Sequence, residues 1–150
     1  MILIERPETL PISLSPALVE EAAQAALHSG NAPEIADLTI VLTNDAQLQQ
    51  LNRQFLGIDA ATDVLSFPIY EHRGEIPDDR ESLLGDIVIN LDAAKRQSSL
   101  YRLTLYGEVR RLLVHGFLHL LGYDHERNSY QQKKMSQKEN EIRNALEAVD

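Results

Sequence analysis

Three histidines in the last third of the chain constrain its structure more than any other feature of the sequence. His115, His119 and His125 lie in the stretch His-Gly-Phe-Leu-His-Leu-Leu-Gly-Tyr-Asp-His, whose remaining positions are mostly apolar. On a helix, positions i and i+4 lie one turn apart on the same face, so the imidazoles of His115 and His119 point the same way. A pair at this spacing is a clamp for one metal ion. The sequence therefore predicts a buried helix that presents a metal site.

Gly122 supplies the means for a third histidine to join this pair. Glycine adopts a left-handed conformation at low cost, which ends a helix and turns the chain back, so His125 can reach the same ion. Three neutral imidazoles suit one Zn²⁺ ion and leave a fourth position for water, an arrangement typical of catalytic sites. Imidazole also suits nickel, copper and iron, so the identity of the metal stays open. Asp124 either orients a ligand imidazole or only shapes the turn.

The spacing of the histidines matches that of the metzincin zinc peptidases, with one difference. Those peptidases carry a glutamate, their general base, directly after the first histidine, and this chain has Gly116 there. A peptidase of that kind would lack its proton acceptor. We therefore expect a zinc hydrolase that has another substrate or another base.

Length and composition indicate one globular domain over residues 1–150, because 150 residues with 43% apolar side chains suffice for a core but not for two ordinary domains. The chain has no cysteine, which excludes disulfides, thiolate ligands and cysteine nucleophiles. The apolar start at residues 1–4 is too short for a signal peptide, and no stretch is long enough to span a membrane. We expect a soluble, cytoplasmic protein.

Charge is distributed unevenly along the chain. The net charge of −9 argues against a protein that coats nucleic acid in general. Residues 95–111 nevertheless form a basic segment directly before the histidine motif, with Glu108 as their one acidic residue and with five basic side chains, Lys95, Arg96, Arg102, Arg110 and Arg111. These are either solvated helix faces or contacts for RNA or a protein.

Strands are expected early in the chain and helices late. Strand patterns occupy residues 1–6, 38–43, 62–68 and 84–90. Helices are predicted from Pro16 to Gly30, after Asn44 with Leu48, Leu51 and Phe55 on one face, and from Asp92 almost to the end, with breaks near 98–99 and 122–128. This order predicts an α+β fold in which helices pack on a small mixed sheet of about four strands.

The chain resembles the YbeY endoribonucleases, the bacterial rRNA-maturation factors. The resemblance rests on the histidine motif, on Thr-Asp-Val-Leu-Ser-Phe-Pro at 62–68 and on Leu-Gly-Asp-Ile-Val-Ile-Asn at 84–90, and Met135 and Glu139 also fit. It implies a zincin-like fold and a zinc ion held by His115, His119 and His125. It further implies single-strand-specific cleavage in the maturation of the 3′ end of small-subunit (16S) rRNA and in ribosome quality control. The implied partners are rRNA, small-subunit ribosomal proteins and ribosome-assembly GTPases.

The sequence departs from the family at two positions. Leu56, before Gly57, stands where the family usually has an arginine thought to engage RNA, and Ala61 stands where proline is common. Arg53 lies one turn earlier on the same predicted helix and is our candidate for contacting substrate in place of that arginine.

The general base is not identified by spacing. The candidates Asp63, Asp86 and Glu108 each have a structural explanation, as turn or capping residues or, for Glu108, as a partner of Arg111 or Arg102. Two other functions remain open. One is a zinc hydrolase of another substrate class, and the other is a ribosome-assembly factor that contains zinc without nuclease activity of its own.

Overall fold

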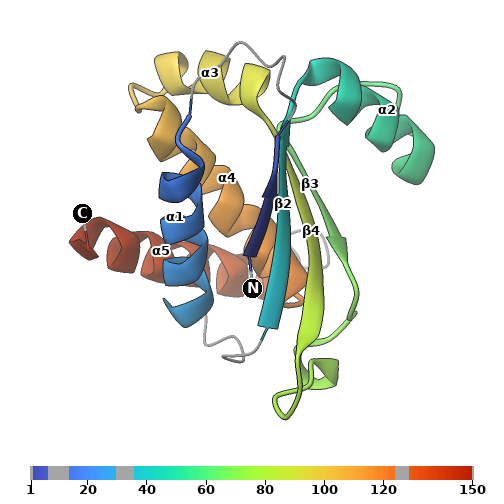
Figure 1. Cartoon of the computed structure of the whole chain (residues 1–150), viewed down its shortest axis with the longest axis vertical. Coiled ribbons are helices and arrows are strands. Elements are labelled where there is room, and N and C mark those ends of the chain that lie inside the picture. Colours follow the sequence, from blue (N-terminus) through green and yellow to red (C-terminus); the bar gives the residue numbers. More distant parts are fainter. Residues whose placement is uncertain (1, 7–13, 30–35, 124–128, 150) are drawn as a thin grey trace.

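The computed structural model describes residues 2–6, 14–29, 36–123 and 129–149. They form one mixed sheet with helices on both faces (Figure 1). The strands are β1 (Ile2–Glu5), β2 (Ala36–Thr43), β3 (Val64–Pro68) and β4 (Ser82–Asn90). The helices are α1 (Pro16–Ser29), α2 (Asp45–Leu56), α3 (Leu91–Leu100), α4 (Leu105–Leu120) and α5 (Ser129–Val149), with a short 3₁₀ turn at Arg73–Glu75. No helix among these residues is sufficiently long and apolar to cross a membrane.

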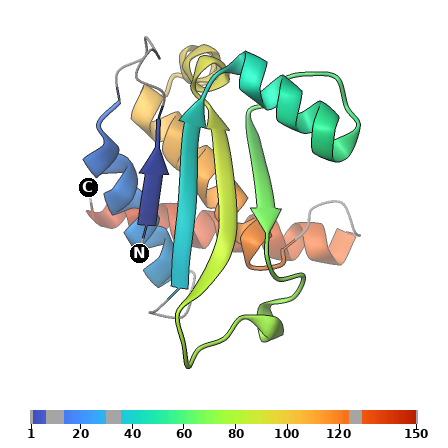
Figure 2. The same cartoon turned by 45° about the vertical axis from the view of Figure 1, so that its right-hand side comes forward.

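The four strands lie in the order β1-β2-β4-β3. Strands β1, β2 and β4 are parallel, whereas β3 runs antiparallel to β4 at one edge of the sheet (Figure 2). The predicted α+β fold with a mixed sheet of about four strands is therefore confirmed. Three of the four predicted strands agree with the structure within two residues at either end, and β1 lies inside the predicted 1–6.

One predicted helix break is displaced. The serines at 98 and 99 stay within α3, because the Ser98 hydroxyl donates to the carbonyl of Lys95 and so is satisfied inside the helix. The chain turns instead at Arg102, whose φ is +57°. Thr104 then caps the start of α4, since its side chain accepts a hydrogen bond from the amide of Gly107. The break thus falls at residues 101–104 and separates α3 from α4.

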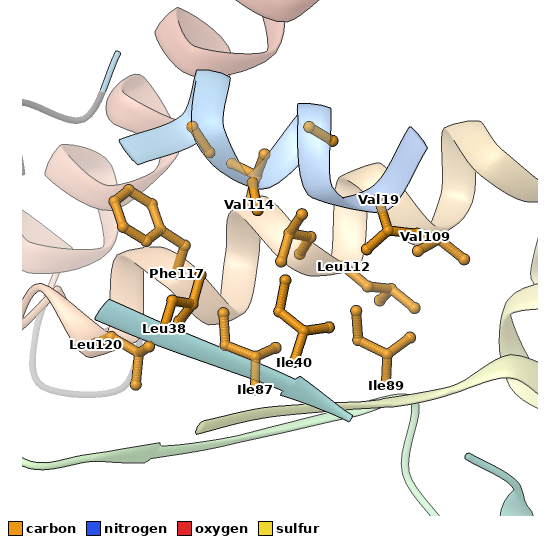
Figure 3. Close-up of a cluster of buried hydrophobic side chains, with 14 of the residues drawn as sticks. Val19, Leu38, Ile40, Ile87, Ile89, Val109, Leu112, Val114, Phe117 and Leu120 are labelled. Carbon is orange, nitrogen blue, oxygen red and sulfur yellow. The ribbon is translucent and has the colours of Figure 1, made fainter. Parts of the chain in front are cut away.

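The main core lies between the sheet and the layer formed by α1 and α4 (Figure 3). Ile40 and Ile87 of the sheet are fully buried, as are Leu112 and Phe117 of α4, and Val19 of α1 closes the layer. The central strands carry the nearly continuous aliphatic stretches 38–42 and 87–89, because both faces of those strands pack against other elements. Helix α4 is therefore held along most of its length.

Helix α2 packs on the opposite face of the sheet (Figure 1). Leu48 is fully buried there against Leu65 and Val88. This agrees with the prediction that Leu48 lies on the apolar face of the helix. Phe55 does not complete that face, because its side chain is 58% exposed and meets Phe67 only in an edge-to-face contact at 5.2 Å. The C-terminal end of α2 projects beyond the sheet, which explains the exposure.

A polar network joins the carboxyl ends of β2 and β4. Asn90 is fully buried and caps α3 by accepting from the amide of Ala93, and its amide donates to Asp45 at 2.7 Å and to the carbonyl of Thr62 at 3.1 Å. Arg96 donates two further bonds of 2.9 Å to Asp45, and these bonds, with that of Asn90, hold the pKa of the Asp45 carboxyl below its usual value. The network ties the segment before β3 to both helix starts.

Two asparagine caps offer a test of this network. Replacing Asn44, which only caps α2, by alanine should lower the free energy of unfolding by about 1 kcal/mol. Asn90→Ala should lower it by about 2–3 kcal/mol, because the cap is lost and the carbonyl of Thr62 also loses its buried partner. Urea denaturation measures both values, and equal losses would contradict the argument.

Candidate metal centre

Helix α4 presents His115 and His119 as the sequence predicts. Both are half-buried, whereas every other residue from Leu112 to Leu120 is buried. Their rings meet edge to face with centroids 4.8 Å apart, and the two Nε2 atoms lie 3.2 Å from each other. Two ring nitrogens thus lie close together at the surface of an otherwise buried helix.

The separation of the two Nε2 atoms fits one bound metal ion. Zinc binds imidazole nitrogen at about 2.0–2.1 Å in tetrahedral geometry, which places two donor atoms about 3.3 Å apart. Among the residues that the structure describes, no group of three or more His, Cys, Asp or Glu side chains could by itself hold a metal ion. The predicted third ligand, His125, and its neighbour Asp124 lie outside the described residues, so the complete ligand set stays a prediction.

Glu139 is the acidic residue that the structure brings to the histidine pair. Its Oε1 atom lies 3.0 Å from Nδ1 of His115. Helix α5 supplies it from the face that also buries Met135 and Ile142, at positions i, i+4 and i+7 of one helical stripe. The histidine spacing gave no sign of this contact, since it joins two helices. The one sequence signal for this contact is that Glu139 lies at a position of the amphipathic helix where the pattern calls for an apolar residue.

Gly116 explains why the peptidase glutamate is missing. A Cβ atom on Gly116 would lie 2.8 Å from Cγ2 of Ile87, closer than Cβ atoms approach other atoms, and 3.1 Å from Oγ of Ser66, which is a tight contact. The hydroxyl of Ser66 also donates to the carbonyl of Gly116 at 3.2 Å. Helix α4 therefore touches β3 and β4 at this residue, and a side chain at position 116 would require neighbouring atoms of the sheet to shift.

Gly122 ends α4 in the manner that the sequence predicts. Its φ is +95°, a left-handed value that other residues rarely adopt. The amide of Gly122 donates to the carbonyl of His119 at 3.0 Å, and a Cβ atom at this position would lie within 4 Å of the backbone of residues 71–73. The chain is thereby redirected immediately after the histidine pair.

None of the three candidate bases, Asp63, Asp86 and Glu108, is placed at the histidine pair by the contacts of the described residues. Asp86 lines a groove of about 500 Å³ on the α2 face of the sheet, whereas its neighbour Ile87 points to Gly116, so the sheet separates Asp86 from α4. Asp63 accepts a hydrogen bond from Gln97 of α3. Glu108 is fully buried, and both of its oxygens accept from Nε of Arg111 at 3.1 Å.

The basic segment is partly neutralised within the fold. Arg96 pairs with Asp45, and Arg111 pairs with Glu108, whose hydrogen bond raises the pKa of the Arg111 guanidinium. Lys95 and Arg102 are exposed. Arg53 is also exposed, but on α2, across the sheet from α4, so the described contacts do not bring it to the histidine pair.

Fold and site together define a class of protein, namely α+β proteins that carry a pair of ligand-spaced histidines on a helix packed against a mixed sheet. The model of the family described as "Endoribonuclease YbeY" matches residues 6–147 of the chain. The chain belongs to the YbeY endoribonuclease family, as its motifs suggest, and it is a hydrolase by that homology.

Curated relatives agree with the family model. The "Endoribonuclease YbeY" of Pelotomaculum thermopropionicum is 44% identical over 125 residues, covering 83% of this chain and 82% of the relative. That of Chloroflexus aggregans is 40% identical over 137 residues, covering 90% of each. The solution structure of TM1509 from Thermotoga maritima matches with a TM-score of 0.60 at 21% identity, over 99% of this chain and 93% of that one. The last comparison supports the fold.

Substitution of Gly116 tests the contact between α4 and the sheet. In an ordinary helix, glycine to alanine is stabilising by about 1 kcal/mol. We expect Gly116→Ala to be destabilising by about 1–3 kcal/mol instead, because the new Cβ meets the stiff side chain of Ile87. Gly74→Ala is the control, since no atom lies within 4 Å of its Cβ position. Thermal denaturation compares them, and a Gly116→Ala protein as stable as its parent would contradict the packing.

Proposed function

We propose that the protein is a zinc-dependent endoribonuclease that cleaves single-stranded RNA during maturation of the 3′ end of 16S rRNA and in ribosome quality control. The observation that carries the proposal is the convergence of the two Nε2 atoms of His115 and His119 at 3.2 Å on the surface of a rigid helix. Family membership supports RNA as the substrate class.

His115 and His119 would hold the ion together with the predicted ligand His125. When bound, the metal supplies Lewis-acid stabilisation of a phosphodiester and activation of a hydroxyl nucleophile. The packing of α4 against the sheet keeps both imidazoles in place without rearrangement, which favours catalysis by positioning. Arg53, exposed on α2, is our candidate for a phosphate contact away from the reacting bond.

We further propose that the chain acts as one domain in the cytoplasm, where ribosomes are assembled. Family membership supports rRNA as its partner. Small-subunit ribosomal proteins and an assembly GTPase are the protein partners that the family suggests. The alternative functions, an assembly factor without nuclease activity and a zinc hydrolase of another substrate class, make different predictions for the following experiment.

The first test is cleavage of a labelled single-stranded RNA that carries the 3′ end of small-subunit rRNA. Zinc-loaded parent protein should cleave it, and His119→Ala should be slower by at least about 100-fold because one metal ligand is lost. His28→Ala is the control, since His28 is exposed in the last turn of α1 and should leave the rate unchanged. Full cleavage by His119→Ala would sink the proposal, and cleavage of casein or esters instead would favour another hydrolase.

A second test concerns Arg53. If its guanidinium contacts a phosphate, Arg53→Ala should raise KM several-fold with kcat unchanged and should reduce the salt dependence of RNA binding by about one counterion. Arg80→Ala is the matched control, because Arg80 is 72% exposed and pairs only loosely with Asp79 at 3.6 Å. Equal KM values and salt slopes for the parent and Arg53→Ala proteins would remove Arg53 from the substrate site.

A further inference from the structure

The two nitrogens of His115 face different partners. Nε2 lies 3.2 Å from Nε2 of His119, on the side where the metal is expected. Nδ1 lies 3.0 Å from the carboxylate of Glu139, which comes from another helix. The ring is therefore held between the proposed ion and a carboxylate.

We propose that Glu139 is a positioning residue that keeps His115 in the one tautomer able to bind the metal. The inference rests on the proposed metal site and adds to it a residue that the histidine motif does not contain. Glu139 does not bind the ion in this account, since it contacts the ring nitrogen that faces away from His119.

The chemistry of imidazole and carboxylate leads to this role. A neutral imidazole has one N–H and one lone pair, on different nitrogens, and a carboxylate only accepts hydrogen bonds. The hydrogen bond to Glu139 therefore places the proton on Nδ1 and leaves the lone pair on Nε2 for the ion. The carboxylate also makes the imidazole a more basic ligand, as in other carboxylate–histidine–zinc arrangements.

The packing of α5 makes the contact a fixed one. Met135 and Ile142, one turn before and one turn after Glu139, are fully buried, so this face of α5 is held against the rest of the fold. The side chain of Glu139 is only 20% exposed and that of His115 32%, which shields their hydrogen bond from water.

A purely structural role explains the residue less well. An apolar side chain between Met135 and Ile142 would continue the buried stripe of α5 without the cost of desolvating a carboxylate. A polar residue that breaks a local packing pattern at a candidate site is typical of a functional constraint.

The test is zinc affinity, measured by competition with a chromophoric chelator. Glu139→Ala should bind zinc about 10- to 100-fold more weakly than the parent. Glu139→Gln should lose less affinity, because its side-chain carbonyl still accepts from Nδ1, and it keeps the shape of the helix if the alanine variant folds poorly. Glu141→Ala on the same helix is the control, since Glu141 is 65% exposed and pairs with Lys138, and its affinity should not change.

A second readout separates positioning from general damage to the helix. Long-range ¹H–¹⁵N NMR spectra of the zinc-loaded parent should place the His115 proton on Nδ1, and Glu139→Gln should retain that tautomer. Equal zinc affinity in the parent, Glu139→Gln and Glu139→Ala proteins would overturn the inference, as would a proton on Nε2 of His115. These measurements contain no RNA, so they test the role of Glu139 even if the protein proves not to be a nuclease. Absence of zinc binding to the parent protein would refute the metal site itself.

Discussion

The close contact between α4 and the sheet at Gly116 is the constraint on which the site depends. With about 100° of rotation per residue, His115 and His119 lie about 100° and 60° around the helix axis from Gly116, both on the same side. Once the glycine faces Ile87 and Ser66, both imidazoles must therefore emerge along one flank of α4. The same flank faces α5, where Glu139 meets His115.

This contact also separates the chain from the metzincin peptidases, which share its histidine spacing. In those enzymes the residue after the first histidine carries the proton acceptor, whereas here a side chain at that position would have to displace Ile87. The difference is therefore coupled to the position of the helix against the sheet. Proton transfer in this chain has to use other groups, and Asp86 and Glu108 are held elsewhere by the sheet and by Arg111.

The sequence predicts well what depends on local periodicity. The order of strands and helices, the facing pair His115 and His119 and the left-handed Gly122 all follow from spacing within one or two turns of chain. The missed features join residues far apart in sequence. The bond between His115 and Glu139 spans 24 positions and that between Arg96 and Asp45 spans 51, so both depend on how helices pack. The face on which Asp86 lies depends on strand register in the same way.

These long-range pairs change the electrostatic argument about RNA. In the sequence, residues 95–111 look like a basic surface on a chain of net charge −9, but Arg96 and Arg111 neutralise Asp45 and Glu108 within the fold. Two of the five basic side chains of this segment are therefore paired with carboxylates, which lowers the number of phosphates that the segment can neutralise and with it the non-specific affinity for RNA. Under the proposed function, recognition of RNA then depends on the proposed metal site and on contacts such as the one proposed for Arg53.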